Sequence, residues 1–210
     1  MMPTLTQALA EWIAGGGREI GEIHLEPGAG GFALSHRGDG ARRDLTEYEG
    51  AEAARELAHF DADGKFRPLK TAPNLRHGWK LRLASLTELR TALDYFYPAM
   101  LGVWLSHRGG RLVAVPLRHT LARQTGMYAI TRKITDDQAQ TMIAGFCRND
   151  GGCLKRILWQ IAPEVPITSL PAEKFQPEAP ANTLPLLCQE ACNLLVAQAR
   201  EVVKKGGAAA

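Results

Sequence analysis

Four cysteines are the residues of this chain whose type and spacing most clearly indicate chemistry. Cys147 and Cys153 lie in "GFCRNDGGC", and Cys188 and Cys192 lie in "LLCQEAC". The first 146 residues of the 210-residue chain contain no cysteine. Because thiolates are the preferred ligands of soft metals, four clustered cysteines predict a zinc site or an iron–sulfur cluster. The alternative is that they are core residues, since a cysteine can also pack as a small apolar side chain.

The spacing of the first pair bears on which metal group is held. Structural zinc sites favour cysteine pairs two to four residues apart, whereas five residues separate Cys147 from Cys153. A 4Fe-4S cluster tolerates varied spacings, and its negative charge would be offset by the neighbouring Arg148, Lys155 and Arg156. Spacing alone leaves core cysteines, zinc and an iron–sulfur cluster open.

The second pair is predicted to lie on one helix. Cys188 and Cys192 are four residues apart, so their thiols would project from the same helix face. Cys153 is expected to begin a helix through "CLKRILWQI", and Cys188 is expected in the first turn of the last helix. Both positions favour the thiolate form, because amide groups at a helix N-terminus stabilise negative charge.

Composition excludes several classes of protein. The 25 Lys and Arg against 22 Asp and Glu give a net charge of only +3, which argues against nucleic-acid binding. No run approaches the ~20 apolar residues that would span a bilayer, and the start lacks the basic segment of a secretory signal. A cytoplasmic, reducing setting is therefore expected, in which paired cysteines are more often metal ligands or redox groups than disulfides.

The first part of the chain mixes helix and strand patterns, which predicts an α+β domain. Capping-box spacings at Thr46 and Glu49 and at Ser85 and Glu88 each predict the start of a helix. Pro98 should kink or break the second of these. The expected helices are residues 4–14, 46–60 and 85–105, and the expected strands are residues 18–27, 30–37, 79–84 and 111–117.

Beyond about residue 130 the pattern predicts only helices and loops. Thr135 and Gln138 are predicted to cap a helix that delivers Cys147. Six prolines between residues 163 and 185 predict an extended connector, and the last helix should have Pro185 in its first turn. The predicted organisation is an α+β domain of residues 1–133 followed by a small helical four-cysteine domain of residues 134–210.

Several segments resemble a known family. They are "RPLKTAPNLRHGWKLRL", "ALDYFYPAMLG", "VPLRHTLARQTGMY", "CLKRILWQI" and "LPLLCQEACNLLVAQARE". Over about residues 40–205 they resemble the C-terminal half of long bacterial proteins of the CbiX-type sirohydrochlorin chelatase group. In that group this half consists of a stabilising domain and a 4Fe-4S cluster-binding domain. The resemblance implies that Cys147, Cys153, Cys188 and Cys192 are the four cluster ligands, with zinc as the alternative cofactor.

The resemblance also implies a function. It suggests a redox or accessory component of tetrapyrrole metabolism that works with a separate chelatase or redox partner protein. The chelatase domain of the relatives has no counterpart in this sequence, so metal insertion is not carried over, and whether the protein is an enzyme stays open. The alternative is a module without a redox role, in which a structural cluster or zinc supports a partner protein.

Two further groups of residues were weighed against ordinary structural roles. A basic set could hold the carboxylates of an anionic tetrapyrrole, although a solvated loop and strand face is the simpler interpretation. The set is Lys70, Arg76, His77, Lys80 and Arg82. The six histidines show no pair at metal-binding spacing along a helix, so surface and packing roles are expected for them.

Overall fold

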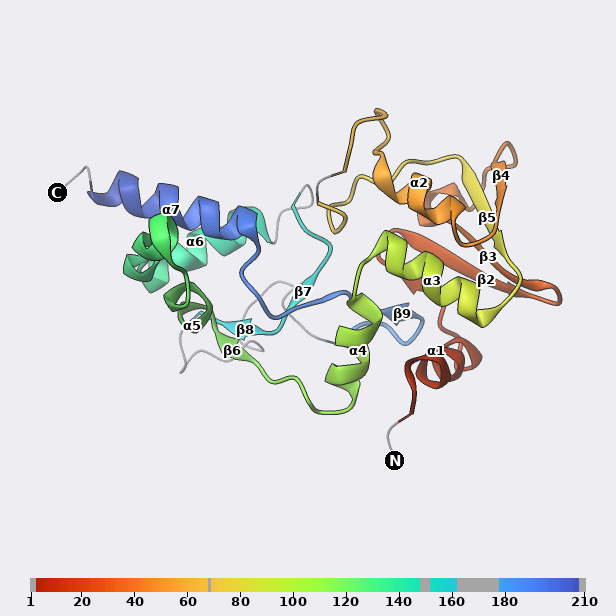
Figure 1. The fold of residues 1–210 in the computed structure, drawn as a ribbon, viewed down its shortest axis with the longest axis horizontal. Coiled ribbons are helices and arrows are strands. Elements are labelled where there is room, and N and C mark those ends of the chain that lie inside the picture. Colours follow the sequence, from red (N-terminus) through yellow and green to blue (C-terminus); the bar gives the residue numbers. More distant parts are fainter. Residues whose placement is uncertain (1–2, 68, 148–151, 162–177, 208–210) are drawn as a thin grey trace. The chain divides into compact units, whose positions relative to one another are not determined.

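The chain forms two compact units (Figure 1). The computed structural model describes residues 3–67, 69–147, 152–161 and 178–207. The first unit comprises residues 1–112 and 178–186, and the second comprises residues 113–177 and 187–210. The first unit therefore receives a segment from near the end of the chain.

The division between the units lies before the expected boundary at residue 133. Residues 113–133 belong to the second unit. The reason is that helix α5 (Leu117–Ala122) packs against the 3-10 helix η2 (Gly126–Lys133), and η2 packs against helix α7 (Asn193–Gly207). Contacts with a helix far along the chain thus decide where this segment belongs.

The first unit is built on a mixed six-stranded sheet. In the order of the sheet, its strands are β4 (Thr46–Glu49), β5 (Trp79–Leu83), β3 (Gly31–His36), β2 (Ile23–Gly28), β1 (Glu19–Ile20) and β9 (Thr183–Leu184). Neighbouring strands are antiparallel except for two parallel pairs, β4 with β5 and β1 with β9. The predicted hairpin of β2 and β3 and the predicted strand β5 are confirmed.

Alternation along the strands places one face of the sheet in the core. In β5, Trp79, Leu81 and Leu83 are buried, whereas Lys80 and Arg82 face the other side. The Trp79 ring stacks on Phe96, with ring centroids 5.3 Å apart. The helices of this unit are α1 (Leu5–Ala14), α2 (Ala53–His59), α3 (Leu86–Phe96) and α4 (Met100–Arg108). Figure 1 shows α3 lying across the sheet.

Local signals set the ends of these helices as predicted. Helix α1 begins after Thr4, whose side chain accepts a hydrogen bond from the amide of Gln7, and it ends at Gly15. The hydroxyl of Ser85 accepts a hydrogen bond from the amide of Glu88 at the start of α3. The break between α3 and α4 falls around Pro98, because a proline inside a helix removes a hydrogen bond and clashes with the preceding turn.

The helix predicted to begin at Thr46 is wrong over its first part. Thr46–Glu49 is strand β4, and helix α2 starts only at Ala53. The strand is favoured because its backbone pairs in parallel with β5, with Glu47 opposite Lys80 in the register. Two hydrogen bonds from Arg82 to the Glu47 carboxylate reinforce that pairing. Tertiary pairing here overrides a local capping signal.

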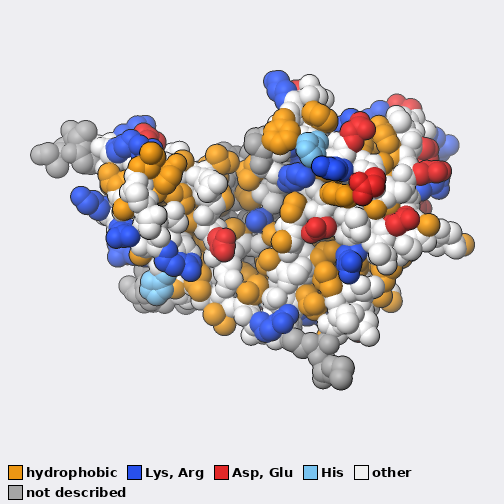
Figure 2. All heavy atoms as spheres, in the orientation of Figure 1, with side chains coloured by type: hydrophobic (Ala, Val, Ile, Leu, Met, Phe, Trp, Pro, Cys, Tyr) orange, Lys and Arg blue, Asp and Glu red, His pale blue; other side chains and the backbone are white. Residues whose placement is uncertain are grey.

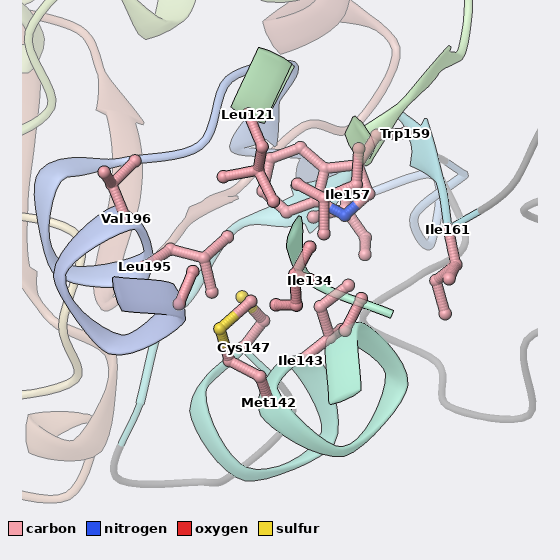
Figure 3. Packing of buried hydrophobic residues seen from close by; sticks show 13 residues of the cluster. Leu121, Ile134, Met142, Ile143, Cys147, Ile157, Trp159, Ile161, Leu195 and Val196 are labelled. Atoms are coloured by element: carbon pink, nitrogen blue, oxygen red, sulfur yellow. The ribbon is translucent and has the colours of Figure 1, made fainter. Parts of the chain in front are cut away.

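The second unit combines helices with short strands around an apolar core. Its helices are α5, η2, α6 (Asp136–Phe146) and α7, and its strands are β6 (Val115–Pro116), β7 (Arg156–Ile157), β8 (Trp159–Gln160) and β10 (Leu187–Cys188). Strand β6 pairs with β8, and β7 pairs with β10, both in parallel. Figure 3 shows Leu121, Ile157 and Trp159 packed together in this core.

The expectation that only helices and loops follow residue 130 is therefore wrong. The helix predicted for "CLKRILWQI" is absent, because Ile157, Leu158 and Trp159 are all buried in succession and their backbone pairs with other strands. Cys188 lies in strand β10, and Pro185 lies between β9 and β10 rather than in the last helix. Most of the proline-rich connector falls outside the described residues.

None of the helices in the described parts of the chain is both long enough and apolar enough to cross a membrane.

Candidate metal centre

Cys147 is delivered by helix α6, as predicted. The helix starts at a capping box in which the Thr135 amide donates to the Gln138 side chain (3.0 Å) and the Gln138 amide donates to the Thr135 hydroxyl (3.2 Å). Cys147 follows the last helical residue, and its amide donates to the carbonyl of Ile143. The residue is only 8% exposed. In Figure 3 its side chain lies beside Met142, on the side of the core toward Leu195.

Cys188 is held by backbone pairing instead of by a helix. It lies opposite Ile157 in the register of β10 and β7, and its carbonyl accepts a hydrogen bond from the amide of Leu158 at 2.8 Å. Its Sγ lies 3.1 Å from the carbonyl oxygen of Glu190, to which the thiol donates. The prediction that Cys188 and Cys192 share a helix face is therefore wrong.

Cys192 occupies the helix-start position that was predicted for Cys188. It directly precedes α7, and its carbonyl accepts a hydrogen bond from the amide of Val196. Its Sγ lies 3.4 Å from the amide nitrogen of Leu195, which donates to it. The sulfur thus acts as a helix cap for the first turn of α7.

Three of the four cysteines share one electrostatic environment. The pKa of Cys188 is raised to about 11, mainly by burial; Cys153 and Cys192 add to the rise, and Lys155 opposes it. Cys153 and Cys188 therefore interact, although they are 35 residues apart in sequence.

Cys147 is linked to this set through the apolar core. It belongs to the buried cluster of the second unit, and Cys188, Ala191 and Cys192 pack against that same cluster. Cys153 and Lys155 lie in the described segment that begins at residue 152, whereas Arg148 falls outside the described residues. The donor set of four thiols, half-buried to buried and beside a lysine, fits a thiolate-ligated metal group.

Both predicted metal groups use thiolate ligands, and a donor set of four cysteines is compatible with either. Across the described residues, one set of three or more potential ligands has all its ligand atoms within 4.8 Å of one another, and that set contains no cysteine.

The set that does meet this distance is one that the sequence-based interpretation missed. It consists of His36, Asp39 and His77, in the first unit. Helical spacing does not apply to this pair, because His36 ends β3 and His77 lies just before the neighbouring strand β5. The signal that could have found them is a histidine at each of two strand ends, with an acidic residue in the turn that follows one of them.

The basic set considered for tetrapyrrole binding is largely neutralised within the protein. Arg82 pairs with Glu47, Lys80 with Glu26 (3.5 Å) and Arg76 with Glu56 (3.7 Å). Lys70 donates to the carbonyl of Tyr95 at 3.1 Å, and burial lowers its pKa. Figure 2 accordingly shows acidic and basic side chains interspersed on the face that it displays.

Comparisons with known proteins divide the chain near residue 108, close to residue 112, where the main segment of the first unit ends. Residues 5–108 match the family model of the DR2241 stabilising domain, and residues 109–201 match that of a 4Fe-4S iron–sulfur cluster binding domain. All four cysteines lie inside the second match. A search of the curated proteins finds no match.

A solved structure matches nearly the whole chain. It is DR2241 from Deinococcus radiodurans, which is described as a multi-domain protein with structural similarity to chelatases and with two additional novel domains. The sequences are 34% identical, the TM-score is 0.72, and the match covers 95% of this chain. This chain spans 42% of the length of that relative. Over residues 5–201 the chain is thus similar to a stabilising domain followed by a 4Fe-4S cluster binding domain.

Proposed function

We propose that the protein binds one 4Fe-4S cluster through Cys147, Cys153, Cys188 and Cys192. The observation that carries the proposal is the convergence of Cys153, Cys188 and Cys192 on one environment, within the segment that matches a 4Fe-4S cluster binding domain. The match of residues 109–201 to a 4Fe-4S cluster binding domain favours a cluster over zinc.

The residues around the thiols have definite roles in this proposal. Lys155 lowers the pKa of Cys188 and would offset part of the negative charge of a thiolate-ligated cluster. The amide at the start of α7 stabilises the sulfur of Cys192. The apolar core beside Cys147 limits access of water, and solvent exposure is one determinant of the potential of such a cluster. When bound, a 4Fe-4S cluster supplies one-electron transfer.

We further propose a redox or accessory role linked to tetrapyrrole metabolism of the sirohydrochlorin chelatase type. The support is the description of the Deinococcus relative as structurally similar to chelatases. This chain spans 42% of the length of that relative. The partner we propose is a chelatase or redox protein. The internal pairing of Arg76, Lys80 and Arg82 makes that basic surface a weak candidate for holding an anionic tetrapyrrole.

A structural role for the cluster is the second candidate. It is favoured by the small size of the second unit and by the packing of three cysteines with its apolar core. Metal ligation can supply folding free energy directly to such a domain. In this case the cluster would stiffen a module that supports a partner protein, without cycling between oxidation states.

Iron and acid-labile sulfide analysis tests the cluster itself. Protein purified without oxygen is expected to contain about four iron and four sulfide per chain and to be brown. Cys188→Ser should lose most of both, because it removes the thiol at the centre of the convergence. Leu194→Ser, an exposed change near Cys192, is the matched control and should keep them. A colourless wild-type protein without sulfide would contradict the proposal.

A redox titration separates the two roles. The carrier role requires that the cluster be reduced reversibly at physiological potentials, with an electron paramagnetic resonance signal in the reduced state. A cluster that resists reduction over that range supports the structural role and rejects electron transfer.

A further inference from the structure

A second group of metal-ligating side chains lies at one end of the sheet in the first unit. His36 is the last residue of β3, Asp39 ends the 3-10 turn η1 (Arg37–Asp39), and His77 lies two residues before β5. One ligand atom from each lies within 4.8 Å of the others. We propose that His36, Asp39 and His77 bind one divalent metal ion of the zinc class, at a site separate from the cysteines.

The sheet register fixes the positions of these side chains. In the antiparallel pair of β3 and β5, Ser35 lies opposite Lys80, so the chain leaving His36 runs beside the chain that enters β5. In the pair of β2 and β3, His36 lies opposite Ile23, which brings Glu22 next to it. The backbone ladder therefore holds the group together without any metal, as a preorganised site requires.

Asp39 offers a carboxylate oxygen to this group. Its side chain is buried, and its Oδ2 accepts a hydrogen bond from the amide of Gly78 at 2.6 Å. Its Oδ1 lies 3.0 Å from Nδ1 of His77 and 3.8 Å from Nη1 of Arg42.

His36 offers a ring nitrogen to this group. Its Nδ1 accepts a hydrogen bond from the amide of Gly38 at 3.0 Å, which uses the single lone pair of that nitrogen. An ion bound at Nδ1 would therefore replace this hydrogen bond. Its Nε2 is buried, makes no hydrogen bond, and lies 3.5 Å from Oε1 of Glu22. A carboxylate behind the far nitrogen of a ligating histidine fixes the ring and raises its basicity.

Gly38 provides the space in which the two rings approach. A Cβ atom at this position would lie 3.0 Å from Nδ1 of His36 and 3.0 Å from Cε1 of His77. With glycine there, the ring centroids of His36 and His77 lie 3.7 Å apart. A larger residue would push the rings apart, so the glycine is part of the site.

The donor set selects the kind of ion. Two imidazoles and one carboxylate suit zinc and similar transition metals, whereas calcium and magnesium prefer oxygen ligands. The side chain of His77 is 49% exposed, so an ion can enter from solvent and keep water as a further ligand. Three protein ligands with one open position is also the arrangement of zinc sites that act on a bound molecule.

Zinc binding to the full chain tests the proposal. The type of ligand atom tells whether the zinc is held by the proposed site or by the cysteines. One equivalent of Zn²⁺ is added to anaerobically prepared protein, its affinity is measured by competition with a chromophoric chelator, and its ligands are read by X-ray absorption. Nitrogen and oxygen ligands at ~2.0–2.1 Å mark the proposed site, and sulfur at ~2.3 Å marks the cysteines. Thiols that hold no cluster are alkylated beforehand, because free thiols would compete for the single equivalent of zinc.

His77→Ala is the informative variant, because this side chain is half-exposed and its loss leaves the core intact. It should lose the nitrogen and oxygen signal and weaken binding by more than the ~10–100-fold typical of losing an outer-shell partner. His119→Ala, an exposed histidine in α5 of the other unit, should bind as the wild type does. Sulfur-only coordination in the wild type, or equal affinity in His77→Ala with unchanged circular dichroism, would overturn the proposal.

Discussion

At the scale of single residues, the protein depends on polar groups that are buried with specific partners. Tyr97 is 2% exposed, and its hydroxyl accepts a hydrogen bond from the amide of Glu22 at 2.9 Å. Gly21 forms the turn beside it with φ +57°, and a Cβ there would lie 2.5 Å from the tyrosine oxygen. The turn between β1 and β2 is thus built against this hydroxyl.

Removing the hydroxyl should therefore cost stability in a way that depends on pH. Tyr97→Phe leaves the buried amide of Glu22 without an acceptor, which should lower the free energy of unfolding by about 1–3 kcal/mol at pH 7. Burial raises the pKa of Tyr97, and the charge of Glu22 adds to the rise. A raised folded-state pKa stabilises the protein below the unfolded value of ~10, and that contribution is lost as the pH rises above it.

Urea unfolding between about pH 8 and 11 measures this effect. The wild type should lose stability above about pH 10 more steeply than Tyr97→Phe, which cannot ionise there. Tyr128→Phe, at an exposed position in the other unit, serves as the control and should follow the wild type. Identical slopes for the wild type and Tyr97→Phe would show that this tyrosine does not ionise on unfolding.

At the scale of elements, short-range signals at helix ends position the cysteines. Helix α6 ends at Cys147, and it begins at the capping box of Thr135 and Gln138. Thr135→Ala removes one of the two capping hydrogen bonds and should destabilise the second unit by about 1 kcal/mol. Thr141→Ala, at an exposed position within the same helix, should change stability by less. Thermal unfolding followed by circular dichroism compares them, and equal midpoints would contradict a capping role.

At the scale of the whole molecule, the two units should respond differently to loss of the metal group. Thiols of the second unit lie in or against its apolar core. Removing the proposed cluster would leave buried thiols, or several thiolates of like charge, around that core. Anaerobic chelation of iron is expected to increase amide hydrogen exchange in α6 and α7 and to leave β2 and β3 protected. Uniform protection in both units after iron loss would show that the group adds nothing to folding.

The sequence by itself determined the features that depend on neighbours a few residues apart. The helix cap at Ser85, the capping box at Thr135, the break at Pro98 and the alternation of β5 all follow from local hydrogen bonding and side-chain direction. The residue type and grouping of the four cysteines left core packing, zinc and an iron–sulfur cluster open, and the family resemblance led to the prediction that they are cluster ligands. That assignment stays a prediction.

Only the tertiary structure decided which distant segments meet. Pairing with β5 made Thr46–Glu49 a strand, and pairing with β7 placed Cys188 in a strand beside Cys192 instead of on one helix with it. The group of His36, Asp39 and His77 likewise depends on the register of two strands separated by more than 40 residues. The physical reason is that backbone pairing over such distances supplies hydrogen bonds and burial that outweigh local propensity, and a single sequence does not encode its register in any short window.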